Sequence, residues 1–356
     1  MSLEQIKLAD ICSFKTGKLN SNAAVEGGKF PFFTCAQETY WINKAAFDTE
    51  AVLLGGNNAN GVYPLKYYKG EFNAYQRTYI IETLDEKKLI TRFLYYALRP
   101  ALAQFQAMSI GAATQYLTKT ILDNFKIGLP AVQVQEKVVE ILSHYDDLIE
   151  NNRRRIQLLE ESARLLYKEW FVQLRFPGHE HVKIVDGVPE GWNKQPIKDV
   201  LTLNYGKALK ADLRIPGECP VYGSSGAVGS HNKALVKAPG IIVGRKGNVG
   251  SIYWVSKDYW PIDTVYYVNS GQSSLFLYHA LQKVPFINTD VAVPGLNRDM
   301  AYSREILTPA ETILSLFHDE VEPIQKQIEQ LFEYNYKLAQ ARDLLLPRLM
   351  NGTLTV

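Results

Sequence analysis

Two glycine-rich turns carry polar side chains that could recognise a ligand. VLLGGNNANGVYPL, beginning at Val52, and IIVGRKGNVGSIYWV, beginning at Ile241, each predict a buried strand that runs into a turn. Arginine, lysine and asparagine side chains hydrogen-bond anions and the edges of planar groups. Asparagine and glycine also tolerate positive φ, so plain hairpin turns are the alternative interpretation. The candidate side chains in the two turns are Asn57, Asn58, Asn60, Arg245, Lys246 and Asn248.

The two turns share one frame. Their starting residues are 189 positions apart (241 − 52 = 189), and at that offset Gly55 falls on Gly244 and Gly61 on Gly250. Between the paired glycines one copy reads Gly-Asn-Asn-Ala-Asn and the other Arg-Lys-Gly-Asn-Val. The pattern indicates a shared scaffold that presents different polar groups in its two copies. Such an arrangement is expected of a protein that recognises ligands through these turns.

The duplication extends along the whole chain. IKLADICSFKTGK pairs with IKDVLTLNYGK, FLYYAL with FLYHAL, and LTKTILDNFKIGLP with LNRDMAYSREILTP. The offset falls from 189 at the turns to 179 at the last pair (296 − 117 = 179), which small loop deletions explain. Each half of the sequence therefore predicts a similar globular domain rich in short strands.

A long helix is expected after each domain, because apolar residues recur there in alternating steps of four and three. Pro323 interrupts the second run, so the sequence predicts a break there and a restart with this proline in the first turn. The first seam is Val138, Leu142, Tyr145, Ile149, Asn152, Ile156, Leu159, Ala163, Leu166 and Trp170. The second seam is Leu314, Phe317, Val321, Ile324, Ile328, Leu331, Asn335, Leu338, Arg342, Leu345 and Leu349.

Helices of this length are on the order of 55 Å long and must pack against something outside one small core. Each follows a similar domain, so antiparallel pairing as a coiled coil predicts a pseudo-twofold α+β molecule. Asn152 and Asn335 then lie near mid-helix, where a buried polar pair would fix the helix register. The predicted domains are residues 1–130 and 176–309, and the predicted helical regions are residues 131–175 and 310–356.

Composition and motifs argue against several classes of protein. The 356 residues are 46% hydrophobic and 21% charged, which is ordinary for a globular protein, and a net charge of +2 requires any nucleic-acid contact to be local. Neither a signal peptide nor an apolar stretch of about eighteen residues is present, so we expect a cytoplasmic protein without a membrane segment. The histidines and the three cysteines lack the spacing of metal, triad or disulfide motifs, and GRKGNVG lacks the order of a phosphate loop. We expect no metal site and no catalytic centre.

Two similar modules held apart by helices suit a ligand with two parts. Double-stranded DNA offers such a ligand, because sites about one helical turn apart, roughly 34 to 36 Å, face the same side of the duplex. The alternative is a coiled-coil adaptor whose duplicated modules use tyrosines to bind protein or glycan. An enzyme acting alone is a third option, which the missing motifs disfavour.

The sequence resembles the specificity (S) subunits of type I restriction-modification systems over essentially its whole length. LPAVQVQEKVVEIL and DDLIENNRRRIQLLEESARLLYKEWFVQLRFPG resemble the central conserved region of that family. VPEGWNKQPIKDVLTLNYGK resembles the start of its second target-recognition domain. The resemblance implies a non-catalytic, DNA-binding subunit in a host-defence system, with one target-recognition domain for each half of a split DNA sequence.

The resemblance also implies partners and cofactors. The helices would set the gap between the half-sites and dock two methyltransferase (M) subunits, and restriction (R) subunits would complete the complex. S-adenosylmethionine, ATP and Mg are expected in those partner subunits, where DNA methylation and cleavage take place, and no cofactor is expected in this chain.

A target-recognition role predicts which polar residues contact DNA. Arg, Lys, Asn and Gln can read base edges in the major groove, and lysines also anchor phosphates. Arg245 and Lys246 suit guanine or phosphate, and Asn248 suits adenine. Lys18 and Lys207, each after a glycine, are candidate phosphate anchors, although an exposed lysine is more often simply solvated. The further candidates are Gln76, Arg77, Gln115, Lys119, Asn297 and Arg298.

Overall fold

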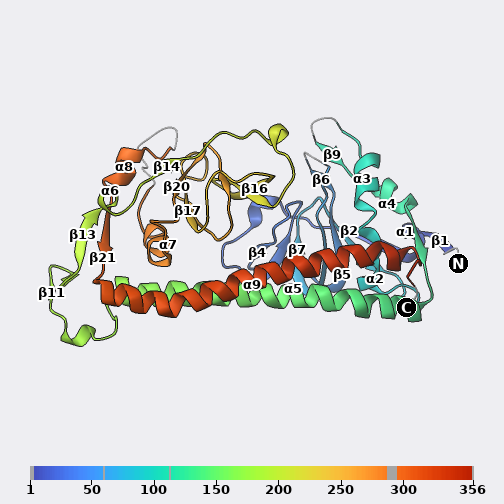
Figure 1. Ribbon diagram of the computed structural model, residues 1–356. Coiled ribbons are helices and arrows are strands. Elements are labelled where there is room, and N and C mark those ends of the chain that lie inside the picture. The colour runs from blue at the N-terminus through green and yellow to red at the C-terminus, as the bar shows by residue number, and fades with distance from the viewer. Residues whose placement is uncertain (1–3, 59–60, 112–113, 287–294, 355–356) are drawn as a thin grey trace. The chain divides into compact units, whose positions relative to one another are not determined.

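The computed structural model divides the chain into two compact units. Unit 1 comprises Met1–Asn151 and Tyr334–Val356, and unit 2 comprises Asn152–Glu333. Each unit contains one β-rich globular part, called domain 1 in unit 1 and domain 2 in unit 2, together with a segment of each long helix (Figure 1). The structure describes residues 4–58, 61–111, 114–286 and 295–354.

Domain 1 is built on a six-stranded sheet with the strand order β2-β8-β5-β7-β3-β4. Its central strand β5 ends in an unbroken apolar run in which Val52 and Leu54 pack into one core cluster and Leu53 into another. Both faces of the sheet are therefore buried at this end of β5, which explains why these residues do not alternate with polar ones. The strands are β2 (Cys12–Thr16), β3 (Phe30–Phe33), β4 (Tyr40–Ile42), β5 (Phe47–Gly55), β7 (Leu65–Ala74) and β8 (Thr78–Thr83).

Short strand pairs and helices complete domain 1. Strand β1 pairs with β10, and β6 pairs with β9, both antiparallel. These strands are β1 (Glu4–Lys7), β6 (Asn57–Asn58), β9 (Gln115–Tyr116) and β10 (Lys126–Leu129). The helices are α1 (Leu8–Ile11), α2 (Thr91–Leu98), α3 (Leu102–Met108) and α4 (Lys119–Asn124), with a 3-10 turn at Ser21–Ala23.

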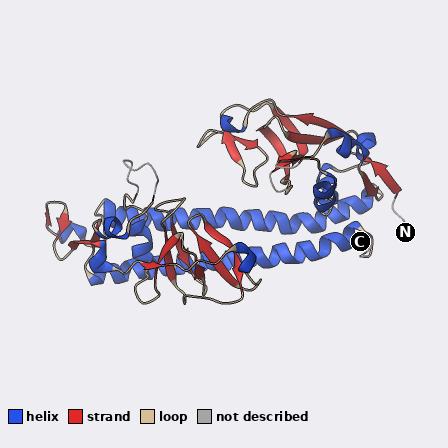
Figure 2. Cartoon of the chain, turned by 90° about the horizontal axis from the view of Figure 1, so that it is seen from above, coloured by secondary structure: helices blue, strands red, loops and turns tan. Residues whose placement is uncertain are grey.

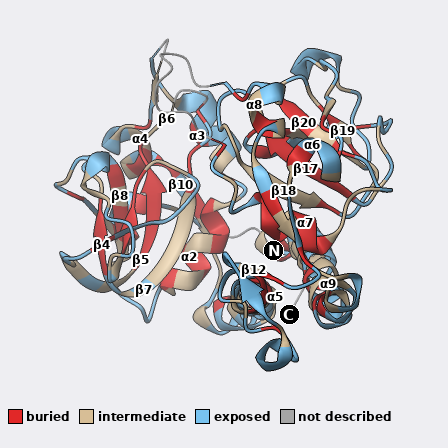
Figure 3. Ribbon diagram, turned by 90° about the vertical axis from the view of Figure 1, so that its left-hand side faces the viewer, coloured by how far each residue is buried: buried red, intermediate tan, exposed pale blue. Residues whose placement is uncertain are grey.

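Domain 2 has a four-stranded sheet with the order β14-β20-β17-β18 and a three-stranded sheet with the order β16-β15-β19. Strand β17 is buried along its whole length, as Figure 3 shows. The strands of the two sheets are β14 (Asn204–Tyr205), β15 (Cys219–Gly223), β16 (Gly226–His231), β17 (Gly240–Gly244), β18 (Ile252–Val255), β19 (Trp260–Pro261) and β20 (Val265–Val268). The remaining elements are β11 (Ile184–Val185), β12 (Val188–Pro189), β13 (Asn193–Pro196), β21 (Glu305–Thr308), α6 (Ile197–Val200), α7 (Leu275–Leu281), α8 (Arg298–Tyr302) and 3-10 turns at His179–His181 and Ala211–Leu213.

The two domains share the arrangement of four strands, β2-β8-β5-β7 in domain 1 and β14-β20-β17-β18 in domain 2, although the sheet is continuous in domain 1 and divided in domain 2. In domain 1 strand β8 lies between β2 and β5, and in domain 2 strand β20 lies between β14 and β17 in the same antiparallel sense. The pair of β1 with β10 corresponds to the pair of β13 with β21. Helices α2 and α4 correspond to α7 and α8. The duplication predicted from the sequence is therefore confirmed, as is the α+β class with two similar domains.

Two long helices follow the domains: α5 (Val132–Tyr167), extended by a π-helical turn at Lys168–Val172, and α9 (Glu311–Met350) (Figure 2). They are antiparallel within each unit. In unit 1, Leu142 of α5 shares a core cluster with Leu349 of α9. In unit 2, Ile156 packs with Ile328, and Tyr167, further along α5, contacts Phe317, which lies earlier in α9. All ten residues of the first predicted seam, nine in α5 and Trp170 in the π-helical turn, are buried or half-buried.

The predicted helix break at Pro323 is wrong, because α9 continues through this residue. Proline removes the N–H that would donate to the carbonyl of Asp319. Pro323 and Asp319 are both exposed, so water can satisfy the freed carbonyl. Val321 and Ile324 next to the proline pack into the core of unit 2 and keep the helix in place.

Candidate nucleic-acid recognition surfaces

In domain 1 the structure brings Asn57, Asn58 and Gln115 together from two separate motifs. Asn57 pairs with Tyr116, and Asn58 pairs with Gln115, in the short ladder of β6 with β9. The Asn58 amide donates to the backbone carbonyl of Val62 at 2.8 Å. The Asn58 and Gln115 side chains therefore form one small polar surface on one face of this ladder, whereas the Asn57 side-chain oxygen is buried and has no hydrogen-bond partner among the described residues. Asn60 lies outside those residues.

Arg77 and Gln76 lie beside this surface. The Arg77 guanidinium stands over the Tyr116 ring, 5.3 Å from its centroid, and the Arg77 carbonyl accepts a hydrogen bond from the Gly56 N–H at 2.7 Å. The Gln76 amide donates to the Asn20 side chain at 2.9 Å. Arg77 is thus held by its aromatic neighbour while Gln76 braces the loop that follows β2.

Lys119 is the first residue of α4, and its charge is already paired. Its ammonium group contacts both carboxylate oxygens of Asp123, at 2.7 and 2.8 Å, and lies 5.5 Å from the Phe14 ring centroid. Lys119 is therefore less available to an external anion than its position suggested.

The glycines before Lys18 and Lys207 explain why the two lysines occupy equivalent places. A Cβ at Gly17 would overlap the carbonyl of Ala74, and one at Gly206 would overlap the carbonyl of Ile262. Only glycine permits such a close backbone approach. Both lysines are exposed, as a phosphate anchor requires.

In domain 2 the turn after β17 and the start of α8 lie side by side. The Arg245 carbonyl accepts a hydrogen bond from the Leu296 N–H at 2.9 Å, and Lys246 forms a β-bridge with Gly295. Asn248 is exposed in the same turn, and its backbone carbonyl accepts from Ser251 at 2.9 Å. Two motifs that are about fifty residues apart in the sequence thus form one surface.

Tyr205 lies at the centre of this surface. The guanidinium carbons of Arg245 and Arg298 lie 5.1 and 5.0 Å from the centroid of the Tyr205 ring. Arg245 also stands 5.7 Å from the Tyr266 ring, and Arg298 stands 5.9 Å from the Tyr302 ring. Burial raises the pKa of Tyr266 to about 12, with a contribution from its hydrogen bond with Tyr205, so this phenol stays neutral. We call the four contacts of Arg245 and Arg298 with the rings of Tyr205, Tyr266 and Tyr302 the arginine–tyrosine stack.

Asn297 has a structural role in addition to its predicted one. It is the N-cap of α8, and its side-chain oxygen accepts a hydrogen bond from the Asp299 N–H at 2.8 Å. Asparagine is among the residues preferred at this position. Its amide oxygen is therefore engaged inside the protein, whereas the neighbouring Arg298 side chain turns to the tyrosines.

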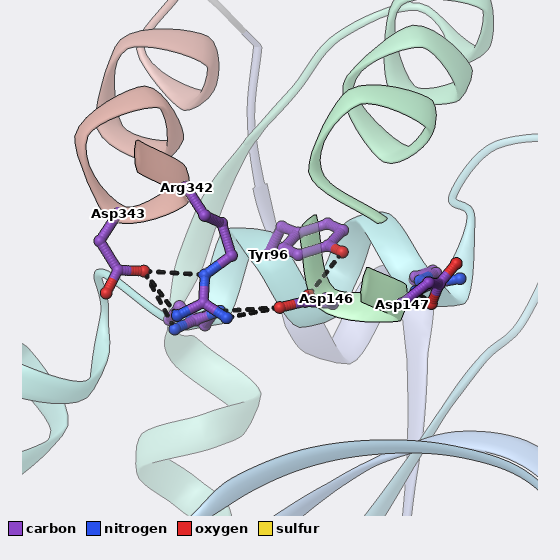
Figure 4. A network of polar contacts seen from close by, with 7 residues as sticks. Tyr96, Asp146, Asp147, Arg342 and Asp343 are labelled. Atoms are coloured by element: carbon purple, nitrogen blue, oxygen red, sulfur yellow. Dashed lines mark hydrogen bonds and ion pairs between the residues drawn. The ribbon is translucent and has the colours of Figure 1, made fainter. Parts of the chain in front are cut away.

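A polar network attaches domain 1 to the helices of unit 1 (Figure 4). The Tyr96 hydroxyl on α2 donates to Asp146 of α5 at 2.7 Å, and Arg342 of α9 donates to the same carboxylate. Burial alone would lower the pKa of Arg342, but hydrogen bonds to Asp146 and Asp343 outweigh it and raise the pKa. Arg99, beyond the end of α2, contacts Asp343 at 3.2 Å. One carboxylate thus ties three helices together.

In unit 2 the corresponding junction is aromatic. Phe171, in the π-helical turn, lies 4.9 Å from both Phe276 of α7 and Phe317 of α9, measured between ring centroids. His279, the counterpart of Tyr96, is buried beside Tyr167. Among the described residues its Nδ1 atom has no hydrogen-bond partner. Burial, with the charge of Lys283, lowers the pKa of His279 to about 4.

The aromatic partners of the cations were missed at the level of sequence. Tyr205, Tyr116 and Phe14 had no assigned role, because tyrosines in strands ordinarily indicate sheet packing. One signal was present, since Tyr205 directly precedes the glycine and lysine of the predicted anchor Gly206-Lys207. The seam residues Asn152 and Asn335 are buried and half-buried, respectively, and their role in register stays a prediction.

Two copies of one α+β domain, with different polar groups on equivalent turns and a long helix after each copy, define a duplicated recognition protein. The profile of the family described as "Type I restriction modification DNA specificity domain" matches residues 2–161 and 189–299, more than half of the chain. The chain belongs to this family.

Individual relatives agree with this assignment. The specificity subunit of the type I restriction enzyme EcoDI from Escherichia coli is 37% identical over 234 residues, covering 59% of this chain and 51% of that protein. The MjaIX specificity subunit from Methanocaldococcus jannaschii is 23% identical over 302 residues, covering 75% of this chain and 70% of that one. The chain thus spans about half the length of the E. coli relative.

A solved structure has a similar fold. The crystal structure of a type I restriction-modification system S subunit from M. genitalium superposes with a TM-score of 0.59 at 17% identity, covering 98% of this chain and 96% of that chain. Within the described ranges, no helix combines the length and the apolar character needed to cross a membrane. The same residues contain no group of three or more His, Cys, Asp or Glu side chains placed to hold a metal ion.

Proposed function

We propose that this chain is the non-catalytic DNA specificity subunit of a type I restriction-modification complex. Domain 1 reads one half of a bipartite target in double-stranded DNA, and domain 2 reads the other. The two long helices set the gap between the half-sites and dock two methyltransferase subunits. Restriction subunits join the same complex, which works in the cytoplasm.

The observation that carries this proposal is that the two domains have a similar backbone arrangement but different polar side chains on equivalent turns. The order of four sheet strands, the glycine positions and the starts of α4 and α8 match between the domains. The surfaces built on that frame differ, with the amides of Asn58 and Gln115 in domain 1 and the arginines Arg245 and Arg298 in domain 2. Equivalent readers with different side chains suit two half-sites of different sequence.

The long helices support the second part of the proposal. Each follows a recognition domain and is joined to it by buried contacts, the polar network in unit 1 and the aromatic junction in unit 2. Because each recognition domain is fixed to a rigid helix, the length of that helix determines the distance between the two DNA half-sites. S-adenosylmethionine, ATP and Mg belong to the partner subunits in this proposal.

The test is to map methylated bases in DNA from cells that express the chain with its methyltransferase subunit. Cells that express the methyltransferase alone are the control. We expect a new methyl-adenine motif made of two short blocks with a fixed unspecified gap. A stable complex that creates no motif would refute the proposal.

The competing function is a coiled-coil adaptor that binds protein or glycan through its aromatic side chains. Exposed rings such as Trp41 and Tyr40 are the observation that favours it. Salt distinguishes the two functions. DNA binding by the assembled complex should weaken steeply between about 50 and 200 mM salt because counterions are released, whereas an aromatic contact surface should respond far less.

A further inference from the structure

The arginine–tyrosine stack pre-orders two guanidinium groups on one ring. Arg245 and Arg298 both lie within about 5 Å of the Tyr205 centroid, each with a second ring behind it. A cation within about 6 Å of an aromatic face is attracted by the ring quadrupole. This attraction offsets the repulsion between the two like charges, so both planar groups are held in place before any ligand arrives.

The hydrogen-bond pattern leaves donors available. Arg245 uses Nη1 to donate to the backbone carbonyl of Asp263 at 3.1 Å. Across the residues that the structure describes, no carboxylate forms an ion pair with Arg298. A guanidinium has five N–H donors in a fixed fork, so each group keeps a free edge. Tyr205 itself is half exposed, which places the stack at the surface.

At the positions equivalent to Arg245 and Arg298, domain 1 has no available arginine. Lys119 occupies the position of Arg298 at the start of the corresponding helix, and Asp123 neutralises it. In domain 2 the residue four positions after Arg298 is the uncharged Tyr302, which stacks on the guanidinium. The counterpart of Arg245 in domain 1 is Gly56, which has no side chain. Two arginines are thus presented in domain 2 where domain 1 presents one neutralised lysine.

The stack lies on the side of domain 2 that faces away from its helices. Figure 1 shows α8 and β14 on the side of domain 2 away from the α9 segment of unit 2, and Figure 3 shows α8 in the same relation to α9, with α7 nearer to that helix. A surface in this position stays open when partner subunits occupy the helices.

We infer that Tyr205 is a positioning residue that holds Arg245 and Arg298 as a pair reading a G·C base pair in the half-site of domain 2. This inference rests on the proposed function. An arginine fork matches O6 and N7 of guanine, the commonest specific contact in the major groove. A phosphate anchor needs charge but no fixed plane, and the exposed Lys207 in the same domain already suits that task.

The experiment measures methylation by the assembled complex on DNA carrying the wild-type motif and on DNA with each half-site position changed singly. Tyr205→Leu should reduce discrimination at a G·C pair by about tenfold to a hundredfold, and Arg298→Gln should act at the same or an adjacent pair. Tyr205→Phe keeps the ring and should retain discrimination. The other half-site should be read as in the wild type by all three variants.

Lys194→Met on β13 of domain 2 is the control, because Glu305 pairs with that lysine at 2.7 Å and neither residue belongs to the candidate recognition surfaces, so this variant should leave both half-sites unchanged. Three outcomes would overturn the inference: full discrimination by Tyr205→Leu, relaxation at an A·T pair, or a uniform loss of rate on every DNA, which indicates a phosphate contact. These outcomes differ from failure of the proposed function, in which the wild-type complex itself has no bipartite motif. Thermal unfolding of Tyr205→Leu checks that domain 2 remains folded.

Discussion

Asp146 should contribute more to the stability of unit 1 than its neighbour Asp147, although both carboxylates lie on α5 and face arginines. Asp146 accepts hydrogen bonds from Tyr96 and Arg342, and its side chain is 20% exposed. Asp147 pairs with Arg92, and its side chain is 64% exposed. The substitutions Asp146→Asn and Asp147→Asn remove one charge each with almost no change in volume.

The expected magnitudes follow from this geometry. A hydrogen bond to a charged group contributes about 1.5 to 3 kcal/mol when buried, and an exposed ion pair about 0 to 1 kcal/mol. Asparagine can still accept from Tyr96, but it leaves the Arg342 guanidinium, whose side chain is 12% exposed, with only Asp343. We therefore expect Asp146→Asn to destabilise unit 1 by about 2 kcal/mol and Asp147→Asn by at most about 0.5 kcal/mol.

The assay combines thermal unfolding with hydrogen exchange of peptides from α2. A loss of about 2 kcal/mol corresponds to a melting temperature lower by about 4 to 8 °C for a unit of this size, with faster exchange across Thr91–Leu98. In a double-mutant cycle, Tyr96→Phe should couple to Asp146→Asn and not to Asp147→Asn. Equal effects of the two asparagine variants, or no coupling to Tyr96, would refute the idea that one carboxylate ties the three helices together.

Three further predictions concern burial. Burial and the charge of Lys283 lower the pKa of His279 to about 4 in the folded protein, whereas a histidine in the unfolded chain has a pKa of about 6.5. The neutral His279 should therefore contribute its full stabilisation of unit 2 above pH 6.5. As the pH falls towards 4, the free energy of unfolding of unit 2 should decrease by up to about 3 kcal/mol more in the wild type than in the His279→Leu variant. The same pH dependence of this free energy in both proteins would contradict the prediction. Burial raises the pKa of Cys12 to about 12, so its thiol stays protonated and unreactive at pH 8. N-ethylmaleimide should therefore label the more exposed Cys35 before Cys12, and mass spectrometry of the native protein measures this order. Asn152→Leu should keep the helices paired but loosen their register, and an unchanged gap in the methylation motif would count against a register role for this buried asparagine.

The helical seams could be predicted because their signal is local and periodic. Val138, Leu142 and Ile156 are buried where steps of four and three placed them. The prediction failed at Pro323, because propensity describes an isolated helix, whereas α9 is supported by packing along its buried side and by water on its exposed side. Tertiary context thus decided the continuity of the helix.

The polar network and the arginine–tyrosine stack could not be found in this way, because each joins residues from distant segments. Arg342 did occupy a seam position, and a cation on an apolar seam requires a facing carboxylate, so a partner such as Asp146 could have been sought on the other helix. No comparable rule predicts that Tyr205 receives Arg245 and Arg298. Their meeting depends on the pairing of β14 with β20 and of β20 with β17, which becomes known only with the fold.

Steric contacts fix the glycines of each recognition turn but do not restrict the side chains between those glycines. A Cβ at Gly244 would overlap the carbonyl of Asn248, and one at Gly55 would lie 2.7 Å from the Pro64 ring. Any other residue at these glycines would force the backbone to move. Lys246 and Asn248, between the glycines, are exposed and can change without disturbing the sheet below. Recognition can therefore diverge between the copies while the fold stays the same, since the residues that hold the turn are separate from those that face outward.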